Sequence, residues 1–454
     1  FQVGGIEQTP VPGGQVAPPH GSDFDTLVER ELFAPMQMTS TTFREPLNDS
    51  DSRNAGAAFS GRWSQGFKRG GGGYKPQVFE YIAQVGPVGG ASSTAADMGR
   101  YMRMLLRGGE LDGTQVPTPA EYARLRSPPL FRNAKEVSGF SYGFFNTRYG
   151  QVETLGHGGA TSWFHSGMTV APELGVGIFI STNTDTGRRF AGQFAGLILE
   201  RYFENARAAA VPAVPAGFDA SRFVGKYNSD RSNHRSAEKV FLSTTQDIAA
   251  ADDQSLVITG NGESSRWIPE GGLVFREAEG QGRISFFEND KGEITGYASA
   301  LGHNAFTRVQ PLSVLDNWLL LLTVTGVLAL LVLVGAWLRR GRREQVAPAA
   351  RRAAFWLYVS AFAWLAWVVA VLVYLKRATG DETGVFYGYP GVLLPVLLWT
   401  APLMLLLSLV NILLLWPFLR ARGWGFWRKS RHLVVVAVFA LAAWSLWAWN
   451  FVGW

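Results

Sequence analysis

Residues 155–160 read Leu-Gly-His-Gly-Gly-Ala, and this stretch decides how the soluble part of the chain is interpreted. It lies between Tyr142–Phe145 and Thr161–Val170, both expected strands, and a third expected strand follows at Val176–Thr182. We predict one antiparallel sheet from these segments. A histidine followed by two glycines at the start of a strand lets another backbone approach closely, because glycine has no Cβ. A substrate carbonyl could lie there as an added strand and accept a hydrogen bond from the N–H of Ala160.

Taken alone, this stretch leaves two interpretations open, because a lone histidine among glycines is a turn at least as often as a site. The segments around it help to decide between these interpretations, because they follow one another in a definite order. Residues 21–38 predict a helix that ends at Pro35, and residues 89–98 read Gly-Gly-Ala-Ser-Ser-Thr-Ala-Ala-Asp-Met, with a capping box formed by Thr94 and Asp97. Gly-Phe-Ser-Tyr-Gly follows at residues 139–143, and Val-Gly-Ile-Phe-Ile-Ser-Thr-Asn ends the series at residues 176–183.

In this order and spacing, residues 20–203 closely resemble the second half of the serine β-lactamase and penicillin-binding-protein family. The resemblance is to its class C, D-alanyl-D-alanine carboxypeptidase and esterase-like branch. It implies an α+β domain in which a serine attacks an amide, β-lactam or ester carbonyl. It also implies that His157, Gly158 and Gly159 form the third motif of the site and that Ala160 donates one oxyanion-hole N–H. His165, on the next strand, is a further candidate for substrate binding.

The sequence departs from the family upstream of this region. The family's S-x-x-K and Y-x-N motifs normally precede the helix at residues 21–38, but only a Pro- and Gly-rich segment, residues 1–19, stands there. We expect either a fragment of a longer enzyme, which is favoured, or a relative that cannot acylate. Ser236 and Lys239 match S-x-x-K, but they lie in a charged stretch beside an expected strand, so we expect no catalysis from them.

Two further regions follow the hydrolase-like residues 20–205. An Ala-, Val- and Pro-rich connector spans residues 206–218. Residues 219–312 contain short apolar runs separated by turn signals, which favour a small antiparallel β-barrel or sandwich. The expected strands include Val240–Leu242, Ser255–Ile258, Leu273–Phe275, Ile284–Phe287 and Ile294–Tyr297.

Residues 313–454 contain four uncharged apolar runs, each long enough to cross a bilayer as a helix. These runs are residues 318–338, 353–375, 391–419 and 433–454. Their polar side chains, such as Ser360, Ser408 and Asn411, are uncharged, which indicates helix packing and argues against an ion or proton path.

Charge predicts the orientation of these spans. Residues 313–454 hold 13 of the 42 Lys and Arg residues and 4 of the 36 acidic residues, a net charge of +9, which leaves −3 for residues 1–312. The basic loops after the first and third spans predict a cytoplasmic location for those loops. Residues 1–312 and the C-terminus are then outside, at the bacterial plasma membrane.

Composition narrows the function classes. The excess of positive charge belongs to the membrane region, so it is no sign of nucleic-acid binding. The absence of cysteine excludes disulfides and thiolate catalysis, and no metal or cofactor is expected. The sequence therefore predicts a membrane-anchored serine hydrolase that acts on a peptidoglycan-like or other small-molecule substrate. Its catalytic serine is expected in an N-terminal half of the same domain, encoded upstream of Phe1. A non-catalytic binding or regulatory relative is the alternative. Without that half, we expect an unpaired sheet edge and an uncovered apolar face.

Overall fold

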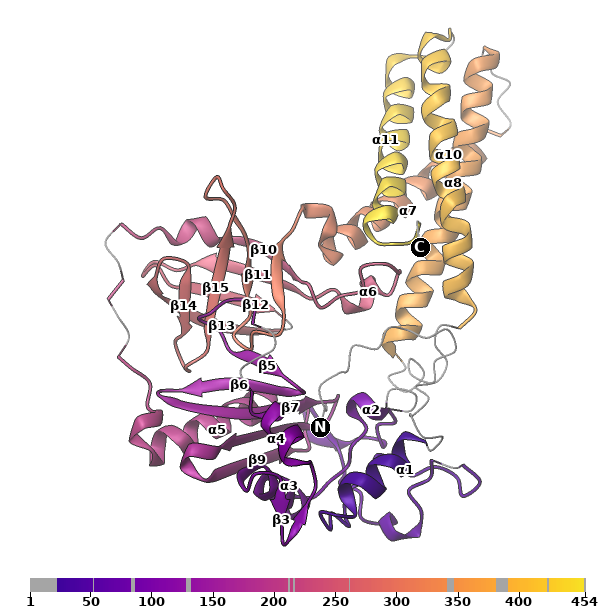
Figure 1. The fold of residues 1–454 in the computed structure, drawn as a ribbon. Helices are drawn as coiled ribbons and strands as arrows, with labels where there is room; N and C mark the ends of the chain where they lie inside the picture. The colour runs from indigo at the N-terminus through magenta and orange to yellow at the C-terminus, as the bar shows by residue number, and fades with distance from the viewer. Residues whose placement is uncertain are drawn as a thin grey trace. The chain divides into compact units, whose positions relative to one another are not determined.

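The computed structural model describes residues 23–452 except residues 52, 83–85, 128–131, 211–212, 215–216, 261, 341–346, 381–390 and 423. The Pro- and Gly-rich segment at residues 1–19 lies outside the described residues. The chain combines helices with a five-stranded sheet, an eight-stranded closed barrel and four long apolar helices (Figure 1). The mixed α+β class, the barrel and the four helices predicted from the sequence are all present.

A five-stranded antiparallel sheet organises the N-terminal region, and its strands pair in chain order. They are β5 (Gly139–Ser141), β6 (Phe144–Tyr149), β7 (Val152–Ala160), β8 (His165–Ala171) and β9 (Val176–Thr182). The smaller elements before the sheet are α1 (Phe24–Val28), the π-helical turn η1 (Glu29–Phe33), η2 (Ala57–Phe59), β1 (Phe67–Gly70), β2 (Gly73–Pro76), α2 (Gly86–Gly89), β3 (Glu110–Leu111), β4 (Thr114–Gln115) and α4 (Pro119–Leu125).

Two helices cover opposite faces of this sheet, as the alternation of side chains along a strand requires. Leu155, Met168 and Val170 pack toward α3 (Ala95–Leu106). Val152, Ala171 and Ile178 pack against α5 (Arg188–Tyr202). Val170 and Ala171 are adjacent in β8 and lie on opposite faces. The sheet is therefore the middle layer of a three-layer arrangement.

Three local predictions differ from the structure. The expected strand at Tyr142–Phe145 is instead the turn between β5 and β6 and the start of β6, with Tyr142 at a φ of 34°. Residues 161–164 form a turn, so β8 begins only at His165. The histidine and glycines lie at the end of β7 and not at a strand start. The ladder between β7 and β8 continues through these glycines to the pair Ala160↔His165.

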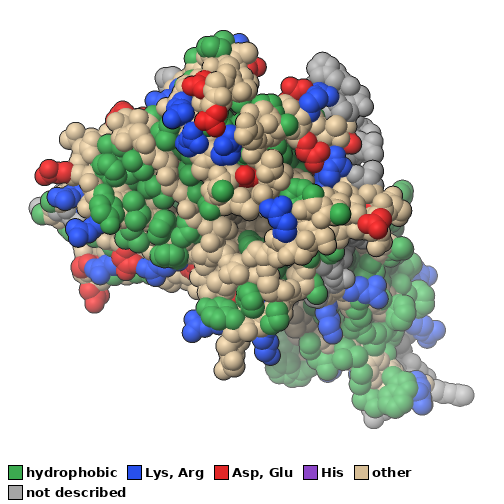
Figure 2. Space-filling model, turned by 90° about the horizontal axis from the view of Figure 1, so that it is seen from below, with side chains coloured by type: hydrophobic (Ala, Val, Ile, Leu, Met, Phe, Trp, Pro, Cys, Tyr) green, Lys and Arg blue, Asp and Glu red, His purple; other side chains and the backbone are tan. Residues whose placement is uncertain are grey.

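One side of the sheet region carries exposed apolar side chains. The outer surface of α5 exposes Phe190, Leu197 and Tyr202. Hydrophobic side chains gather on the side of the molecule where α5 lies (Figure 2). In the described part of the sheet, β9 is the last strand, and only the single bridge Phe67↔Thr184 continues beyond it.

An eight-stranded barrel follows the connector, and each strand pairs with the next in sequence. Its strands are β10 (Gly225–Ser229), β11 (Thr245–Ala250), β12 (Leu256–Gly260), β13 (Glu263–Gly271), β14 (Val274–Glu277), β15 (Arg283–Glu288), β16 (Ile294–Ala298) and β17 (Ala305–Arg308). Rings fill its interior: Phe286 lies 4.7 Å from Phe223, 5.4 Å from Phe275 and 5.2 Å from Tyr297 between centroids. Of the barrel and sandwich alternatives, the structure has the barrel.

The prediction of a strand at Val240–Leu242 is wrong. These residues form the short helix α6 (Lys239–Leu242) between β10 and β11. Ala237 and Val240 belong to the same buried cluster as residues of the long apolar helices. Val240 therefore packs against the long helices, and tertiary packing explains why the segment is a helix and not a strand of the barrel.

Four helices are long and apolar enough to span a membrane, which indicates a membrane protein. They are α7 (Leu315–Leu338), α8 (Pro348–Gly380), α10 (Leu393–Arg420) and α11 (Phe426–Ala448). The first three agree closely with the predicted spans. The fourth begins at Phe426 instead of Leu433 and ends at Ala448 instead of Trp454, so its first turns carry cations.

The polar residues of these helices make contacts between helices, as predicted. The amide of Asn411 donates to Ser360 Oγ over 2.6 Å, and Ser408 Oγ donates to the carbonyl of Phe439 over 3.2 Å. Trp318 Nε1 donates to Ser445 Oγ over 3.1 Å. Such hydrogen bonds hold helices together where lipid tails compete for apolar contacts.

Candidate functional site

The last four residues of β7 have one strand edge without a partner among the described strands. β6 pairs with β7 only as far as Phe145↔Gly156. β8 continues along β7 to the pair Ala160↔His165. The edge of His157–Ala160 that faces away from β8 is therefore open to an added strand.

The ladder shows which backbone groups face this open edge. Thr161 N–H donates to the carbonyl of Phe164 over 2.9 Å at the turn between β7 and β8. Opposite residues of an antiparallel ladder alternate between hydrogen-bonded and non-hydrogen-bonded pairs. The pairs Ala160↔His165 and Gly158↔Gly167 are therefore non-hydrogen-bonded. The N–H and C=O groups of Ala160 and Gly158 consequently point away from β8, toward the open edge.

The glycines of this strand are not equivalent. A Cβ on Gly156 would lie 2.5 Å from the carbonyl oxygen of Met168, so β8 can approach only because that Cβ is absent. A Cβ on Gly158 would be 3.6 Å from the carbonyl oxygen of Ser166, which is ordinary van der Waals contact. The absence of a Cβ is thus required at Gly156, where β8 approaches. The approach of a substrate backbone at Gly158 and Gly159 stays a prediction.

His157 is half-buried, and its ring lies over the end of β6. The ring stacks on Phe145 with centroids 5.1 Å apart and an interplanar angle of 27°. Its Nδ1 lies 2.5 Å from the carbonyl oxygen of Gly158. Because a carbonyl only accepts hydrogen bonds, this contact makes Nδ1 the protonated nitrogen and leaves Nε2 as the acceptor in a neutral ring.

The loop between β16 and β17 also contacts the ring of Phe145. The ring of His303, between β16 and β17, meets Phe145 edge to face at a centroid distance of 5.0 Å. The N–H of Ser138, next to β5, donates to the carbonyl of Ala300 over 3.2 Å. Phe145 therefore connects His157 to a histidine from a distant part of the sequence.

The turn after Ala160 is held by a carboxylate from the loop region. Glu80 Oε1 accepts a hydrogen bond from Ser162 N–H over 2.7 Å. Glu80 Oε2 is buried and has no hydrogen-bond partner among the described residues. Glu80 thus fixes the turn that ends the open strand.

This turn borders a cavity of about 690 Å³, which is large enough for a small-molecule substrate. Thr161, Phe164 and Ser166 form part of its wall, and Glu45, Arg62 and Glu80 place charges in it. Hydroxyl groups and aromatic rings complete the lining, contributed by Ser40, Ser92, Ser93, Thr182, Phe59, Trp63, Phe79 and Phe179. The cavity offers both apolar contact and groups of either charge.

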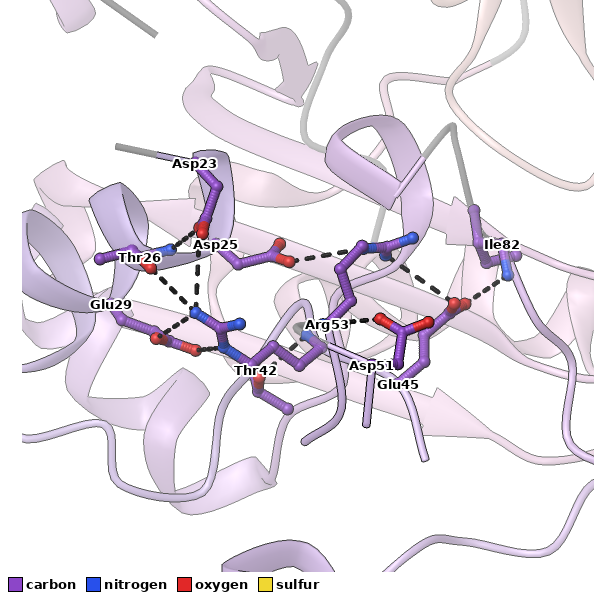
Figure 3. A network of polar contacts seen from close by, with 10 residues as sticks. Asp23, Asp25, Thr26, Glu29, Thr42, Glu45, Asp51, Arg53 and Ile82 are labelled. Atoms are coloured by element: carbon purple, nitrogen blue, oxygen red, sulfur yellow. Dashed lines mark hydrogen bonds and ion pairs between the residues drawn. The ribbon is translucent and has the colours of Figure 1, made fainter. Parts of the chain in front are cut away.

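An ion-pair network holds the carboxylate of Glu45, one of the charged groups that line the cavity (Figure 3). Arg53 lies between Asp25, 3.5 Å away, and Glu45, 3.8 Å away. Glu45 Oε1 also accepts a hydrogen bond from Ile82 N–H over 2.5 Å. Burial raises the pKa of Asp25, and the positive charges of Arg53 and Arg44 oppose that rise. The network ties helix α1 to the loop that carries Glu45.

Asp97 has a partly different role from the one predicted. Thr94 Oγ1 accepts a hydrogen bond from Asp97 N–H, so Thr94 is the N-cap of α3. The carboxylate of Asp97 accepts hydrogen bonds from Ser40 N–H and Thr41 Oγ1, over 2.8 and 2.7 Å. It therefore joins α3 to the segment after η1, and its role is structural.

His165 is only 5% exposed and does not line the described cavity. Burial lowers its pKa, and the positive charge of Arg188 adds to this effect. The histidine is therefore neutral at ordinary pH. It faces Ala160 across the ladder but is enclosed by protein.

The S-x-x-K match at Ser236 and Lys239 is engaged elsewhere. Lys239 Nζ donates to the carbonyl of Ala448 over 2.7 Å, at the end of α11, and lies 5.6 Å from the ring centroid of Trp449. Ser236 Oγ donates to the carboxylate of Glu238. Burial lowers the pKa of Lys239. The lysine serves as a helix-end contact, which agrees with the expectation that this motif is not catalytic.

Comparison with known proteins identifies the N-terminal region. Residues 13–201 match the family model described as Beta-lactamase. This match supports the serine β-lactamase and penicillin-binding-protein family for this part of the chain. A comparison with curated proteins finds no match.

Several solved structures are similar to the chain at low sequence identity. The octameric penicillin-binding protein homologue from Pyrococcus abyssi is 14% identical, with 63% of this chain and 60% of that chain covered and a TM-score of 0.33. SurE is 15% identical, with 64% of each chain covered and a TM-score of 0.41. A D-stereospecific amidohydrolase from Streptomyces sp. is 17% identical, with coverage of 41% and 50% and a TM-score of 0.29. The chain thus spans less than two thirds of the length of each.

Proposed function

We propose that the chain is a membrane-anchored serine hydrolase of the β-lactamase and penicillin-binding type. It would act by acyl transfer or hydrolysis on a D-amino-acid peptide, a β-lactam or an ester. The observation that carries this proposal is the open edge of His157–Ala160, which is followed directly by Thr161 in the wall of a polar, aromatic-lined cavity. The family match over residues 13–201 supports the reaction class.

The backbone of the open edge fits the needs of acyl transfer. When a serine hydroxyl adds to a carbonyl carbon, the carbonyl oxygen becomes negative and needs N–H donors already in place. We assign one such donor to Ala160, whose N–H points away from β8. Gly158 and Gly159 would bind substrate along the edge, where the N–H and C=O of Gly158 also point outward.

The two histidines receive different roles in this proposal. His157 Nε2 would accept a hydrogen bond from substrate or support the proton relay, because Nδ1 lies against the carbonyl of Gly158. His165 was predicted to bind substrate. Its burial, with 5% of its surface exposed, favours a supporting role opposite Ala160 over direct contact with substrate.

The nucleophile would come from a segment of the same domain that lies outside these 454 residues. The sequence contains no Y-x-N, and its one S-x-x-K places Lys239 on the carbonyl of Ala448. These two facts also favour the alternative, a non-catalytic module that binds acyl compounds at the same edge.

The anchor sets where this chemistry takes place. The four helices hold the domain at a membrane, and the distribution of Arg and Lys favours an orientation with residues 1–312 outside the cytoplasm. We propose the plasma membrane of a bacterium and a peptidoglycan-like substrate, since such peptides lie on that side.

A fluorescent penicillin tests the proposal on the full chain. We expect no covalent adduct with the chain alone, and an adduct when the chain is produced together with a segment that carries S-x-x-K and Y-x-N. Ala160→Pro removes the N–H donor and should slow adduct formation on the order of 10²–10³-fold. Ala160→Gly keeps the N–H and is the matched control.

The outcomes separate the two candidates. An adduct on Ser236 with the chain alone would contradict the assignment of the nucleophile. Reversible penicillin binding without an adduct, even with the added segment, would support the binding module. Equal rates for Ala160→Pro and Ala160→Gly would remove Ala160 from the oxyanion hole.

A further inference from the structure

One end of the four-helix bundle is crowded with cations. It combines the C-terminal ends of α7 and α10 with the N-terminal ends of α8 and α11 (Figure 1). Ala350 and Ala353 of α8 pack with Phe418 of α10 and with Trp424, so these ends are joined. We call this end the basic rim; its cations are Arg339, Arg340, Arg351, Arg352, Arg420, Arg422, Arg428, Lys429 and Arg431.

The basic rim lacks a balancing charge within the described part of the bundle. In the described residues between 313 and 452, Asp316 is the only acidic residue, and it lies at the start of α7, at the opposite end. Like charges at this spacing repel one another unless anions neutralise them. The rim therefore needs negative charge from outside this set of residues.

Arginine side chains at the rim are held against indole rings. Arg420 lies 3.9 Å from the ring centroid of Trp416, and Arg340 lies 4.5 Å from that of Trp337. The two rings are 64% and 59% exposed. A guanidinium over a ring face keeps N–H groups around its edge, and this planar fork matches two oxygens of a phosphate. The pairs thus hold phosphate-binding groups at the depth where indole rings prefer to lie, the headgroup zone.

Lys429 differs from the arginines of the rim. Its Nζ donates to the carbonyls of Leu419 and Ala421, over 2.6 and 2.9 Å. It closes the C-terminal end of α10 with its own hydrogen bonds. The exposed guanidinium groups of Arg420, Arg422 and Arg431 are therefore the better candidates for binding an external anion.

Apolar side chains beside the arginines define the kind of anion. Phe426 and Trp427, at the start of α11, are 74% and 77% exposed. Leu338 and Leu413 expose apolar surface on the adjoining helices. A phosphate joined to a long apolar body would cover both the guanidinium groups and this surface.

We propose that the basic rim binds anionic phospholipids, with the phosphate on the arginine forks and the acyl chains along the neighbouring helices. This inference does not depend on the proposed hydrolase activity. A zwitterionic phospholipid offers the same apolar body with less net negative charge, and free phosphate offers the charge without the body.

The full chain in detergent provides the test. Phosphatidylglycerol, phosphatidylcholine and inorganic phosphate are titrated separately, and binding is followed by tryptophan fluorescence and by thermal stability. We expect selective binding of phosphatidylglycerol that weakens with added salt. The variant Arg420→Gln/Arg422→Gln/Arg431→Gln should bind it on the order of a hundredfold more weakly, because each cation near an anionic surface contributes about 1 kcal/mol.

The matched control removes cations from the other end of the bundle. Lys376 and Arg377 are exposed near the C-terminal end of α8, so Lys376→Gln/Arg377→Gln should leave phosphatidylglycerol binding unchanged. Equal binding of phosphatidylcholine by the unaltered chain would overturn the proposal, even if the triple variant failed to fold. An equal loss of phosphatidylglycerol binding in the Lys376→Gln/Arg377→Gln variant would also overturn it. So would complete displacement of phosphatidylglycerol by inorganic phosphate.

Discussion

The five-stranded sheet and the eight-stranded barrel are both antiparallel, but they end differently. The barrel joins its strands in a ring, and aromatic side chains such as Phe286 fill its interior. The sheet leaves one edge of His157–Ala160 open, and the next residue, Thr161, lines a cavity. A closed ladder uses its backbone groups internally, whereas an open one can offer N–H groups to a ligand. The barrel is therefore a closed structural unit, whereas the sheet has an edge at which the proposed chemistry would take place.

The largest expected effect tests the barrel as a closed core. Phe286→Ala removes a buried ring that contacts three others and should lower the free energy of unfolding by about 3–5 kcal/mol. Phe287→Ala is the control, because Phe287 is adjacent in β15 and only half-buried. Calorimetry of the full chain measures both variants. Equal losses would mean that the barrel interior is not the stabilising core.

Two alanine substitutions test how closely β8 approaches β7 at Gly156 and at Gly158. Gly156→Ala forces a Cβ to 2.5 Å from the carbonyl oxygen of Met168 and should cost about 1–3 kcal/mol, as other overpacked sites do. Gly158→Ala adds the same group where 3.6 Å is available. Surface changes of this kind usually alter stability by about 0.5 kcal/mol or less. Thermal unfolding that ranks the two variants in the reverse order would contradict the described ladder.

The smallest effect concerns pH and the buried His165. Its folded pKa is lowered by burial from the ordinary value of 6.5, so the unfolded chain binds a proton that the folded domain resists. Stability should therefore fall as pH drops below 6.5, and the loss should end once pH is below the folded pKa. His165→Gln should reduce this acid-induced fall in Tm by roughly 2–4 °C. An unchanged pH profile in the variant would place the titrating group elsewhere.

The sequence predicted the elements with strong local signals. Uncharged runs of membrane length predicted the four helices, and the order of short motifs predicted the β-lactamase-like region. The predicted position of His157, at the start of a strand, was wrong, because His157 lies near the end of β7. Glycines suggested a strand start, whereas the pairs Gly158↔Gly167 and Gly159↔Ser166 continue β7 through these glycines.

Other features depend on contacts that no local pattern contains. Val240–Leu242 is too short for its apolar run to distinguish strand from helix, and contacts with the long helices decide for α6. Glu80 holds the turn after Ala160 from a loop without periodicity. His303 reaches Phe145 from a barrel loop. These two residues were missed because their partners are far away in the sequence.

The contact between Lys239 and the carbonyl of Ala448 also bears on the order of events during synthesis. The two residues are 209 positions apart, and the acceptor lies in the last turn of the last long helix. Asn450 adds a hydrogen bond to the carbonyl of Ser236 over 3.2 Å. Because chains emerge from the N-terminus and fold as they do so, segment 233–240 must wait for α11 before it can dock. Docking of this segment therefore requires that the whole of α11 has been synthesised.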